Sequence, residues 1–160
     1  MAATDLNDLN NFEYHWETAA VTFLNTDVGI SVVRTVVEDS LLTPRIEIQF
    51  MLEDAYEPHA PRNGGASSTT QDYRAFNSNF QARLITDNAT GGAADHATYR
   101  SKIRTALMRS AANWGSSNLP YYDLKHIRPS GTEYDADGDM NVSQMNYDLV
   151  WEIRDDAWPA

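Results

Sequence analysis

The sequence predicts an α+β fold in which an antiparallel β-sheet of four or five strands carries two main helices packed on one face. Two stretches show helical apolar spacing, and the strands between and after them occur in runs rather than in strict alternation with helices. The chain has 160 residues and no internal repeat. We therefore expect a single domain over residues 1–160, large enough to bury its own core.

The first element is expected to be a helix. Asn7 or Asp8 could cap its start, and residues 25–29 should end it. Because bulky aromatic side chains share one stripe, this helix should pack on the sheet. The apolar positions at helical spacing are Leu9, Phe12, Trp16, Ala19, Ala20 and Phe23.

Two or three strands should follow this helix. Residues 30–37 are rich in β-branched side chains, which favour a strand. Residues 45–53 alternate apolar and polar side chains, which indicates a half-buried strand. Alternation resumes in residues 73–86, which should pair antiparallel with 45–53.

The segment between these two strands, residues 54–72, has no periodicity and is rich in proline, glycine, serine and threonine. So long an insertion inside a compact domain is uncommon, and it is usually either functional or disordered. We expect a long flexible loop that becomes ordered on meeting a neighbour. Plain disorder is the alternative.

A second helix is expected after a polar turn at residues 87–94. Asp95 is a suitable N-cap, and Gly115 sits where a helix would end. Its buried stripe should consist of Tyr99, Ile103, Ala106, Leu107, Ser110, Ala111 and Trp114.

The outer face of this second helix is basic in an otherwise acidic chain. Two interpretations are open: a solvated helix face, or a docking face for an acidic patch on a neighbouring copy. The basic residues are Arg100, Lys102, Arg104 and Arg109.

The chain should end in two strands. We expect a strand at residues 121–128, a turn at Pro129-Ser130-Gly131, an acidic loop, and then a closing strand at residues 145–153. Trp158 follows that strand, and it could insert into a neighbour's pocket or pack on its own domain. Strict alternation in the closing strand puts five large apolar side chains on one sheet face: Met145, Tyr147, Leu149, Trp151 and Ile153.

The net charge of −11 should repel nucleic acid at long range. This acidity could serve solubility alone, or it could form a wall past which DNA slides without sticking. The absence of cysteine excludes disulfides and thiolate chemistry and fits a reducing compartment. The sequence lacks an apolar run of the roughly 20 residues needed to span a bilayer, and its N-terminus lacks the features of a signal peptide.

The acidic loop at residues 135–141 places oxygen side chains at alternate positions, as at the start of a calcium loop. Met140 stands where that loop needs glycine, and Asn146 stands where it needs a closing glutamate. We interpret the segment as a hairpin turn around Asp137-Gly138 and predict no metal site. The alternative is a calcium-dependent module with three ligands: Asp135, Asp137 and Asp139.

No set of residues predicts catalysis. The sequence shows no nucleophile elbow and no phosphate loop, so we predict no catalytic, cofactor-binding or metal-binding residue. A different class stays open, a small ligand-binding or hydrolytic α+β domain with the long loop as a lid and Glu57 and His59 as acid or base. The histidines lack the spacing of a zinc helix and are expected to be packing or surface residues: His15, His59, His96 and His126.

Three segments resemble neck or tail proteins of tailed bacteriophages. They are Thr-Pro-Arg-Ile-Glu-Ile at 43–48, Leu-Pro-Tyr-Tyr-Asp-Leu at 119–124, and Tyr-Asp-Leu-Val-Trp-Glu-Ile-Arg at 147–154 with Ala-Trp-Pro at 157–159. The family that the chain resembles is the tail terminator, also called the tail completion protein. The order of elements is similar over most of residues 8–158.

This resemblance implies a non-enzymatic structural protein at the head–tail junction of a virion, assembled in the host cytoplasm. Members of the family form a hexameric ring that caps the tail tube and joins it to the head connector. The implied partners are sister copies, the tail tube protein and the connector or stopper, with DNA passing through the lumen unbound and no membrane involved. Another neck or head-completion protein, such as a stopper or adaptor, is the alternative within this class.

Overall fold

The computed structural model describes residues 12–34, 43–55, 75–89, 92–109, 114–115 and 118–157. Two long helices, α2 (Phe12–Val28) and α3 (Gly92–Met108), lie on one face of a sheet. A short 3-10 helix, η1 (Asp155–Ala157), follows the last strand. The strands are β1 (Ser31–Arg34), β2 (Arg45–Ala55), β3 (Ala75–Asp87), β4 (Tyr122–Asp137) and β5 (Met140–Ile153).

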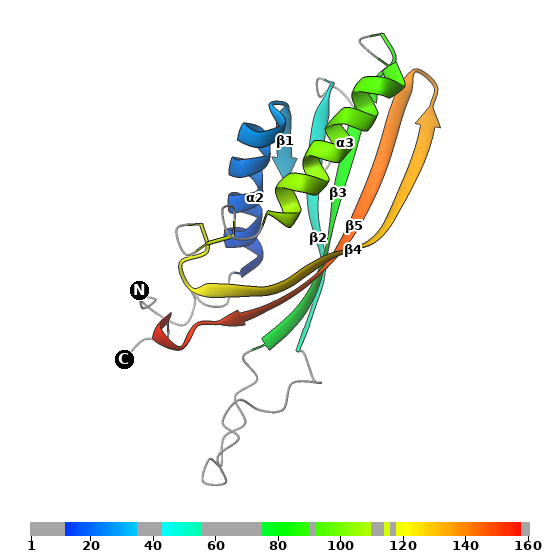
Figure 1. Ribbon diagram of the computed structural model, residues 1–160. Coiled ribbons are helices and arrows are strands. Elements are labelled where there is room, and N and C mark those ends of the chain that lie inside the picture. Colours follow the sequence, from blue (N-terminus) through cyan, green and yellow to red (C-terminus); the bar gives the residue numbers. More distant parts are fainter. Residues whose placement is uncertain are drawn as a thin grey trace, which may run out of the picture.

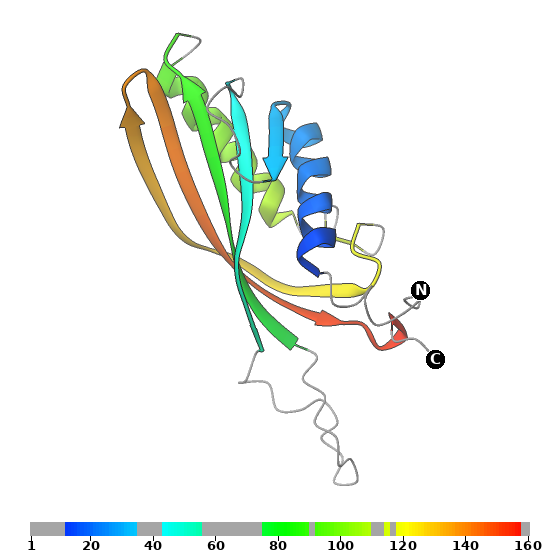
Figure 2. The same ribbon diagram turned by 180° about the vertical axis from the view of Figure 1, so that it is seen from behind.

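The five strands form one open sheet in the order β1-β2-β3-β5-β4. Both helices cover the same side of this sheet, as Figures 1 and 2 show from front and back. The predicted α+β class, strand number and helix placement are therefore confirmed. Strands β2, β3, β5 and β4 pair antiparallel, whereas β1 pairs parallel with β2, Ser31 opposite Arg45. The sheet is therefore mixed and not purely antiparallel as predicted, since β-branched composition indicates a strand but not its direction.

The helical stripe of α2 is buried as predicted. Trp16 and Ala20 are fully buried, and Phe12 and Phe23 are nearly so. The helix ends where the sequence indicated, because Gly29 adopts a φ of 79° and its N–H donates to the Asn25 carbonyl at 3.0 Å. Leu9 and the two candidate caps, Asn7 and Asp8, lie outside the described residues.

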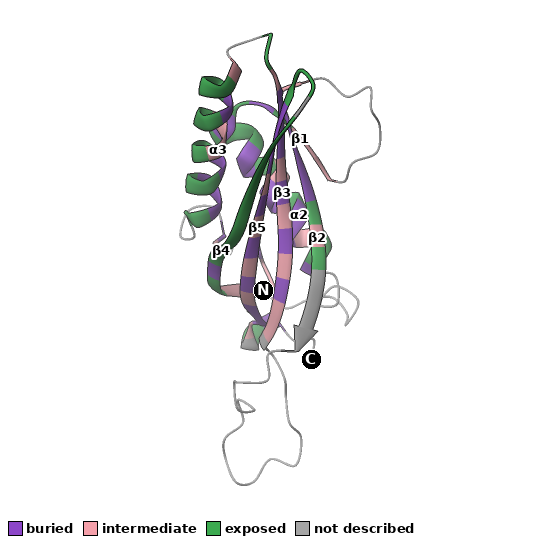
Figure 3. Ribbon diagram, turned by 90° about the vertical axis from the view of Figure 1, so that its right-hand side faces the viewer, coloured by how far each residue is buried: buried purple, intermediate pink, exposed green. Residues whose placement is uncertain are grey.

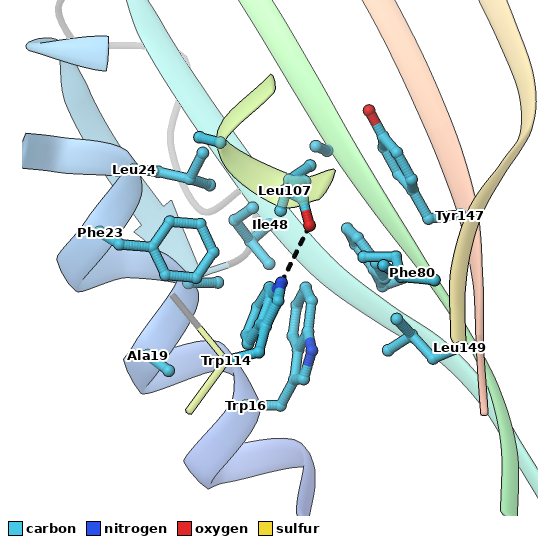
Figure 4. Packing of buried hydrophobic residues seen from close by; sticks show 14 of the residues in the cluster. Trp16, Ala19, Phe23, Leu24, Ile48, Phe80, Leu107, Trp114, Tyr147 and Leu149 are labelled. Carbon is cyan, nitrogen blue, oxygen red and sulfur yellow. Dashed lines mark hydrogen bonds between the residues drawn. The ribbon is translucent and has the colours of Figure 1, made fainter. Parts of the chain in front are cut away.

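The core lies between the helices and the apolar face of the sheet (Figure 4). Trp16 of α2 packs on Phe80 of β3, with ring centroids 4.1 Å apart, and Phe80 stacks on Tyr147 of β5 at 4.9 Å. The five alternating side chains predicted for the closing strand, Met145 to Ile153, are all buried. The amphipathic faces read from the sequence therefore meet each other.

The second helix differs in its ends from the prediction. It begins at Gly92, so Asp95 lies in the first turn instead of capping it, where its carboxylate still favours the positive end of the helix. The helix stops at Met108, so neither Trp114 nor Gly115 belongs to it. Trp114 is nonetheless buried, because the chain beyond the helix returns to the core.

Strand β4 contradicts the predicted turn at residues 129–131. The strand continues through Pro129 and Gly131, with register shifts at Leu124/His126 and Pro129/Gly131. A proline is tolerated there because β4 is an edge strand and the irregularity leaves its missing N–H without consequence. The hairpin turn instead falls at Gly138 (φ 60°), so β5 begins at Met140, five residues before the predicted start.

The long segment after β2 is only partly described. Residues 54 and 55 belong to β2, and β3 begins at Ala75 rather than at residue 73. Residues 56–74, and with them the expected loop, lie outside the described part of the chain.

Candidate functional site

The face of the sheet that carries no helix is lined with polar side chains that bond to one another. The Gln81 side-chain amide on β3 donates to Gln144 and Asn146 on β5, both at 3.1 Å. One step along the strands, the Asn79 amide donates to the Asp148 carboxylate. These cross-strand bonds form an amide-rich row along the middle of the open face.

Glu47 on β2 holds two arginines on this same face. Its carboxylate accepts from Arg45 Nε at 2.9 Å and lies 3.4 Å from Arg83 Nη1. Glu47 is only 2% exposed, so its charge is compensated by the two guanidinium groups rather than by water.

Two further ion pairs lie toward β4. Lys125 Nζ lies 2.7 Å from the Glu152 carboxylate, and Arg128 Nε lies 3.3 Å from Asp148. Among the described residues, every cation on or beside the open face therefore has a carboxylate partner. These four cations are Arg45, Arg83, Lys125 and Arg128. The face therefore offers no unpaired cation there to hold a phosphate.

His96, in the first half of α3, is buried between two hydroxyl groups. Its Nδ1 lies 2.8 Å from Thr86 Oγ1 on β3, and its Nε2 lies 2.8 Å from Ser143 Oγ on β5. Burial, and secondarily the charge of Arg100, lowers the pKa of His96 below its ordinary value of 6.5. Ser143 is completely buried, so this serine–histidine pair has no access to a substrate and ties α3 to the sheet.

Sequence reasoning expected His96 to be a packing or surface residue and did not find its two partners. A signal for them was present, since Ser143 shares its strand face with Met145, and Thr86 shares its face with Leu84. Two hydroxyls on apolar faces require a polar partner from the covering helix.

The other predicted histidines do not converge with His96. His15 is half-buried on α2, and its ring lies edge-on to the ring of Tyr121 and tilted to that of Tyr122. His126 is exposed on β4. His59 and Glu57, the candidate acid or base of a hydrolytic site, lie outside the described residues, as does Trp158. Among the residues that are described, no three His, Asp or Glu side chains gather to form a metal site.

The tip of the β4–β5 hairpin is acidic, as the sequence indicated, and it forms the hairpin turn that we expected around Asp137-Gly138. The Asp135 carboxylate accepts from the N–H of Ala136, its own neighbour, at 2.8 Å. We call the side chains of Glu133, Asp135, Asp139 and Met140 the acidic hairpin. All four are exposed, as is most of the outer strand β4 (Figure 3). None of the three carboxylates forms an ion pair with a described residue.

The four basic residues at positions 100–109 divide into two groups on opposite flanks of α3, because each residue turns a helix by roughly 100°. Arg109 is the first residue after the helix. Arg100 and Arg104 lie on the flank near His96 and Tyr147, whose ionisation their charges influence. Lys102 and Arg109 lie on the flank that faces α2. In the described structure none of the four pairs with a carboxylate.

A hollow of about 290 Å³ lies between α3 and the end of α2. Lys102 and Arg109 give it positive charge, and Asp27 of α2 is the carboxylate in its lining. We call this hollow the basic groove. Its lining residues are Asp27, Ser101, Lys102, Thr105, Ala106 and Arg109.

Comparison with known proteins finds the fold but no close relative. No protein-family model matches the sequence, and no curated protein matches it. Among solved structures, the chain is similar to a chain in the structure entitled "Virion of native gene transfer agent (GTA) particle", with a TM-score of 0.51 and 19% identity. The match covers 86% of this chain and 90% of that chain. At this identity the similarity establishes a shared fold.

None of the described helices is long and apolar enough to cross a bilayer.

Proposed function

We propose that this protein is a structural subunit of a phage-like virion, a tail terminator that forms a hexameric ring on the tail tube at the head–tail junction. The observation that carries the proposal is the shared fold with a chain of a gene transfer agent virion, which extends over 86% of this chain and 90% of that one. Near-complete coverage on both sides means that the whole domain, rather than one motif, is similar.

The described surfaces fit this role better than that of an enzyme. The buried serine–histidine contact has no opening, and His15 and His126 lie apart from it. Neighbouring subunits of a ring contact each other through two different surfaces of the same chain. The acidic hairpin and the basic groove are two such surfaces. The protein would therefore act by binding sister copies, a tail tube protein and a connector protein, inside the virion.

The electrostatics suit a ring through which DNA passes. The net charge is −11, and each described cation of the open sheet face already pairs with a carboxylate. DNA binding depends mainly on unpaired Lys and Arg side chains that neutralise phosphates. A ring that exposed such a face to its lumen would let DNA pass without specific binding.

The test is assembly with the tail tube protein of the same phage. The purified protein should form rings on tube ends in negative-stain images and should give a ring-sized species by light scattering when tube protein is added. Tube protein alone is the control and should show uncapped ends. A protein that stays monomeric at high concentration and leaves tube ends bare would refute the proposal.

A further inference from the structure

Two exposed surfaces of this chain carry opposite charge, and among the described residues neither the cations of the first nor the carboxylates of the second form an ion pair. The basic groove presents Lys102 and Arg109 beside the hydroxyls of Ser101 and Thr105. The acidic hairpin presents Glu133, Asp135 and Asp139. Charged side chains without a counter-charge are common on protein surfaces. In this acidic chain, however, the basic residues are concentrated in one place, since 4 of the 12 fall within residues 100–109.

The acidic hairpin also carries an exposed apolar side chain, since Met140 is 37% exposed there. A methionine side chain adapts its shape to the surface that it meets, so Met140 can add apolar contact to a charged interface.

We propose that these two surfaces bind each other between copies, so that the basic groove of one subunit receives the acidic hairpin of the next. The inference rests on the proposed ring, and it names the contact that would build it. A surface hollow of about 440 Å³ on the hairpin is lined by Glu133, Asp135 and Gln144, among others. That hollow gives the long side chain of Arg109 or Lys102 of a neighbour room to reach both carboxylates.

The positions of the two surfaces require a head-to-tail contact. In β4, Glu133 and Asp135 stand opposite Gln144 and Val142 of β5, which point away from the helices. The basic groove is lined by Asp27 of α2 and by residues 101–109 in and just after α3. Both helices lie on the other face of the sheet (Figure 1). Each contact therefore joins two different surfaces, the groove of one copy and the hairpin of the next. Such heterologous contacts close into a ring when the rotation between copies allows it.

A second copy fits the basic groove better than nucleic acid does. The two cations of the groove share their lining with Asp27, and the chain as a whole carries −11. DNA would meet long-range repulsion from that charge, whereas a β-hairpin brings three carboxylates on one short element. The opposite charges of the groove and the hairpin are enough to attract two copies of the protein to each other without a third molecule.

The experiment exchanges the charges. The helix variant carries Lys102→Glu with Arg109→Glu, and the hairpin variant carries Glu133→Lys with Asp135→Lys. Sedimentation velocity at low ionic strength measures the self-association of each variant, of their equimolar mixture, and of a chain with all four substitutions. Each variant alone should associate at least about tenfold more weakly than wild type, because like charges then face each other.

The mixture and the four-substitution chain should recover association. In the mixture, the acidic groove of one variant meets the basic hairpin of the other, and the two unchanged surfaces meet in the next contact. The four-substitution chain has the wild-type net charge, so recovery there cannot come from a change in overall repulsion. Added salt should weaken all associating samples, because the contact is electrostatic.

Arg100→Glu with Arg104→Glu is the matched control, since it makes the same charge change on the opposite flank of the same helix. It should associate more strongly than the helix variant. Equal loss in this control, no recovery in the mixture, or no association of wild type at low salt would each overturn the proposed contact.

The same variants separate the possible outcomes. The first possible outcome is that wild type and the hairpin variant bind a double-stranded DNA oligomer but the helix variant does not. The groove then binds nucleic acid, and the inference is wrong. If every variant still forms rings on tail tubes, the contact is wrong while the proposed function stands. If charge-dependent self-association follows the exchange but no ring ever caps a tube, the contact holds and the proposed function fails.

Discussion

Trp114 stacks on Trp16 with ring centroids 4.8 Å apart and ring planes 16° from parallel, although Trp114 lies beyond the end of α3. Its indole N–H donates to the Leu107 carbonyl at 2.9 Å, near the end of that helix (Figure 4). The bond satisfies one of the last carbonyls of α3, a group that a helix cannot pair within itself. The Trp114 side chain therefore satisfies a backbone carbonyl at the end of α3 and also fills the core between the two helices.

Trp114→Ala should destabilise the protein by about 3–5 kcal/mol, because it removes a large buried ring and a buried hydrogen bond together. Urea unfolding followed by circular dichroism measures this change. Trp114→Phe keeps a ring against Trp16 but leaves the Leu107 carbonyl without its donor, so it should cost about 1–3 kcal/mol. A loss below about 0.5 kcal/mol in both variants would show that the stack contributes little.

Glu47→Ala should destabilise the protein by about 3 kcal/mol, the lower end of the range for breaking a buried ion pair, because Glu47 and Arg45 are buried while Arg83 is 33% exposed and can be solvated by water. Glu133→Ala, which removes an exposed carboxylate without an ion pair among the described residues, serves as the control and should change stability by less than about 0.5 kcal/mol. Denaturant titration of both variants provides the comparison. Similar values for the two would mean that the charges at Glu47 are screened by water.

Stability should fall on acidification through the titration of His96. Its folded pKa lies below 6.5, so below pH 6.5 the unfolded chain takes up a proton that the folded chain does not. The free energy of unfolding should therefore decrease by up to about 1.4 kcal/mol per pH unit until the folded pKa is reached.

Comparison of variants isolates this effect. Glu17 acts with the opposite sign, because burial raises its pKa above 4.5 and the folded chain then binds the extra proton. The difference between wild type and His96→Gln, measured by unfolding between about pH 7.5 and 5.5, removes that contribution. His126→Gln, which changes an exposed histidine, serves as the control. An unchanged slope in His96→Gln would contradict the assignment.

Gly138→Ala should destabilise the protein by about 1–2 kcal/mol, because Gly138 adopts a φ of 60° that an L-residue with a Cβ adopts at a cost. Open space surrounds its missing Cβ, so the loss would come from the backbone alone. Gly131→Ala is the matched control on the same hairpin, since it also has open space but no positive φ, and it should be neutral or slightly stabilising. In thermal melts, the melting temperature should therefore fall for Gly138→Ala and should stay the same or rise slightly for Gly131→Ala.

The periodic parts of the sequence predicted the fold well. The stripe of α2 and the alternation from Met145 to Ile153 identified side chains that are buried in the structure, because burying one face of each element is what specifies the packing. The end of α2 at Gly29 could also be read from the sequence, since it depends on a local backbone conformation.

The errors came where tertiary contacts override local signals. Pro129-Ser130-Gly131 has the composition of a turn, but pairing of β4 with the long β5 carries the strand through it at a sheet edge. Trp114 fits a helical stripe by spacing, but it reaches the core from outside the helix. The direction of β1 depends on which end of β2 the chain returns to, and that is not encoded in the strand itself.

The surfaces were only partly readable. The basic residues of the second helix and the acidic hairpin were visible as charge patterns, yet their division into flanks and faces depended on the helix ends and the strand register. The polar contacts of His96 and Glu47 join strands and a helix that are distant in sequence, so spacing alone could not assemble them.

The irregular outer edge of β4 has a consequence for how copies associate. A straight, fully hydrogen-bonding edge would let strands of further copies add without limit and grow into fibres. Pro129 lacks an N–H to offer, and the two register shifts in β4 break the even row of backbone groups that such growth would need. The outer edge of β4 is thus poorly suited to backbone pairing with a strand of another copy, and contact along this edge would depend on side chains.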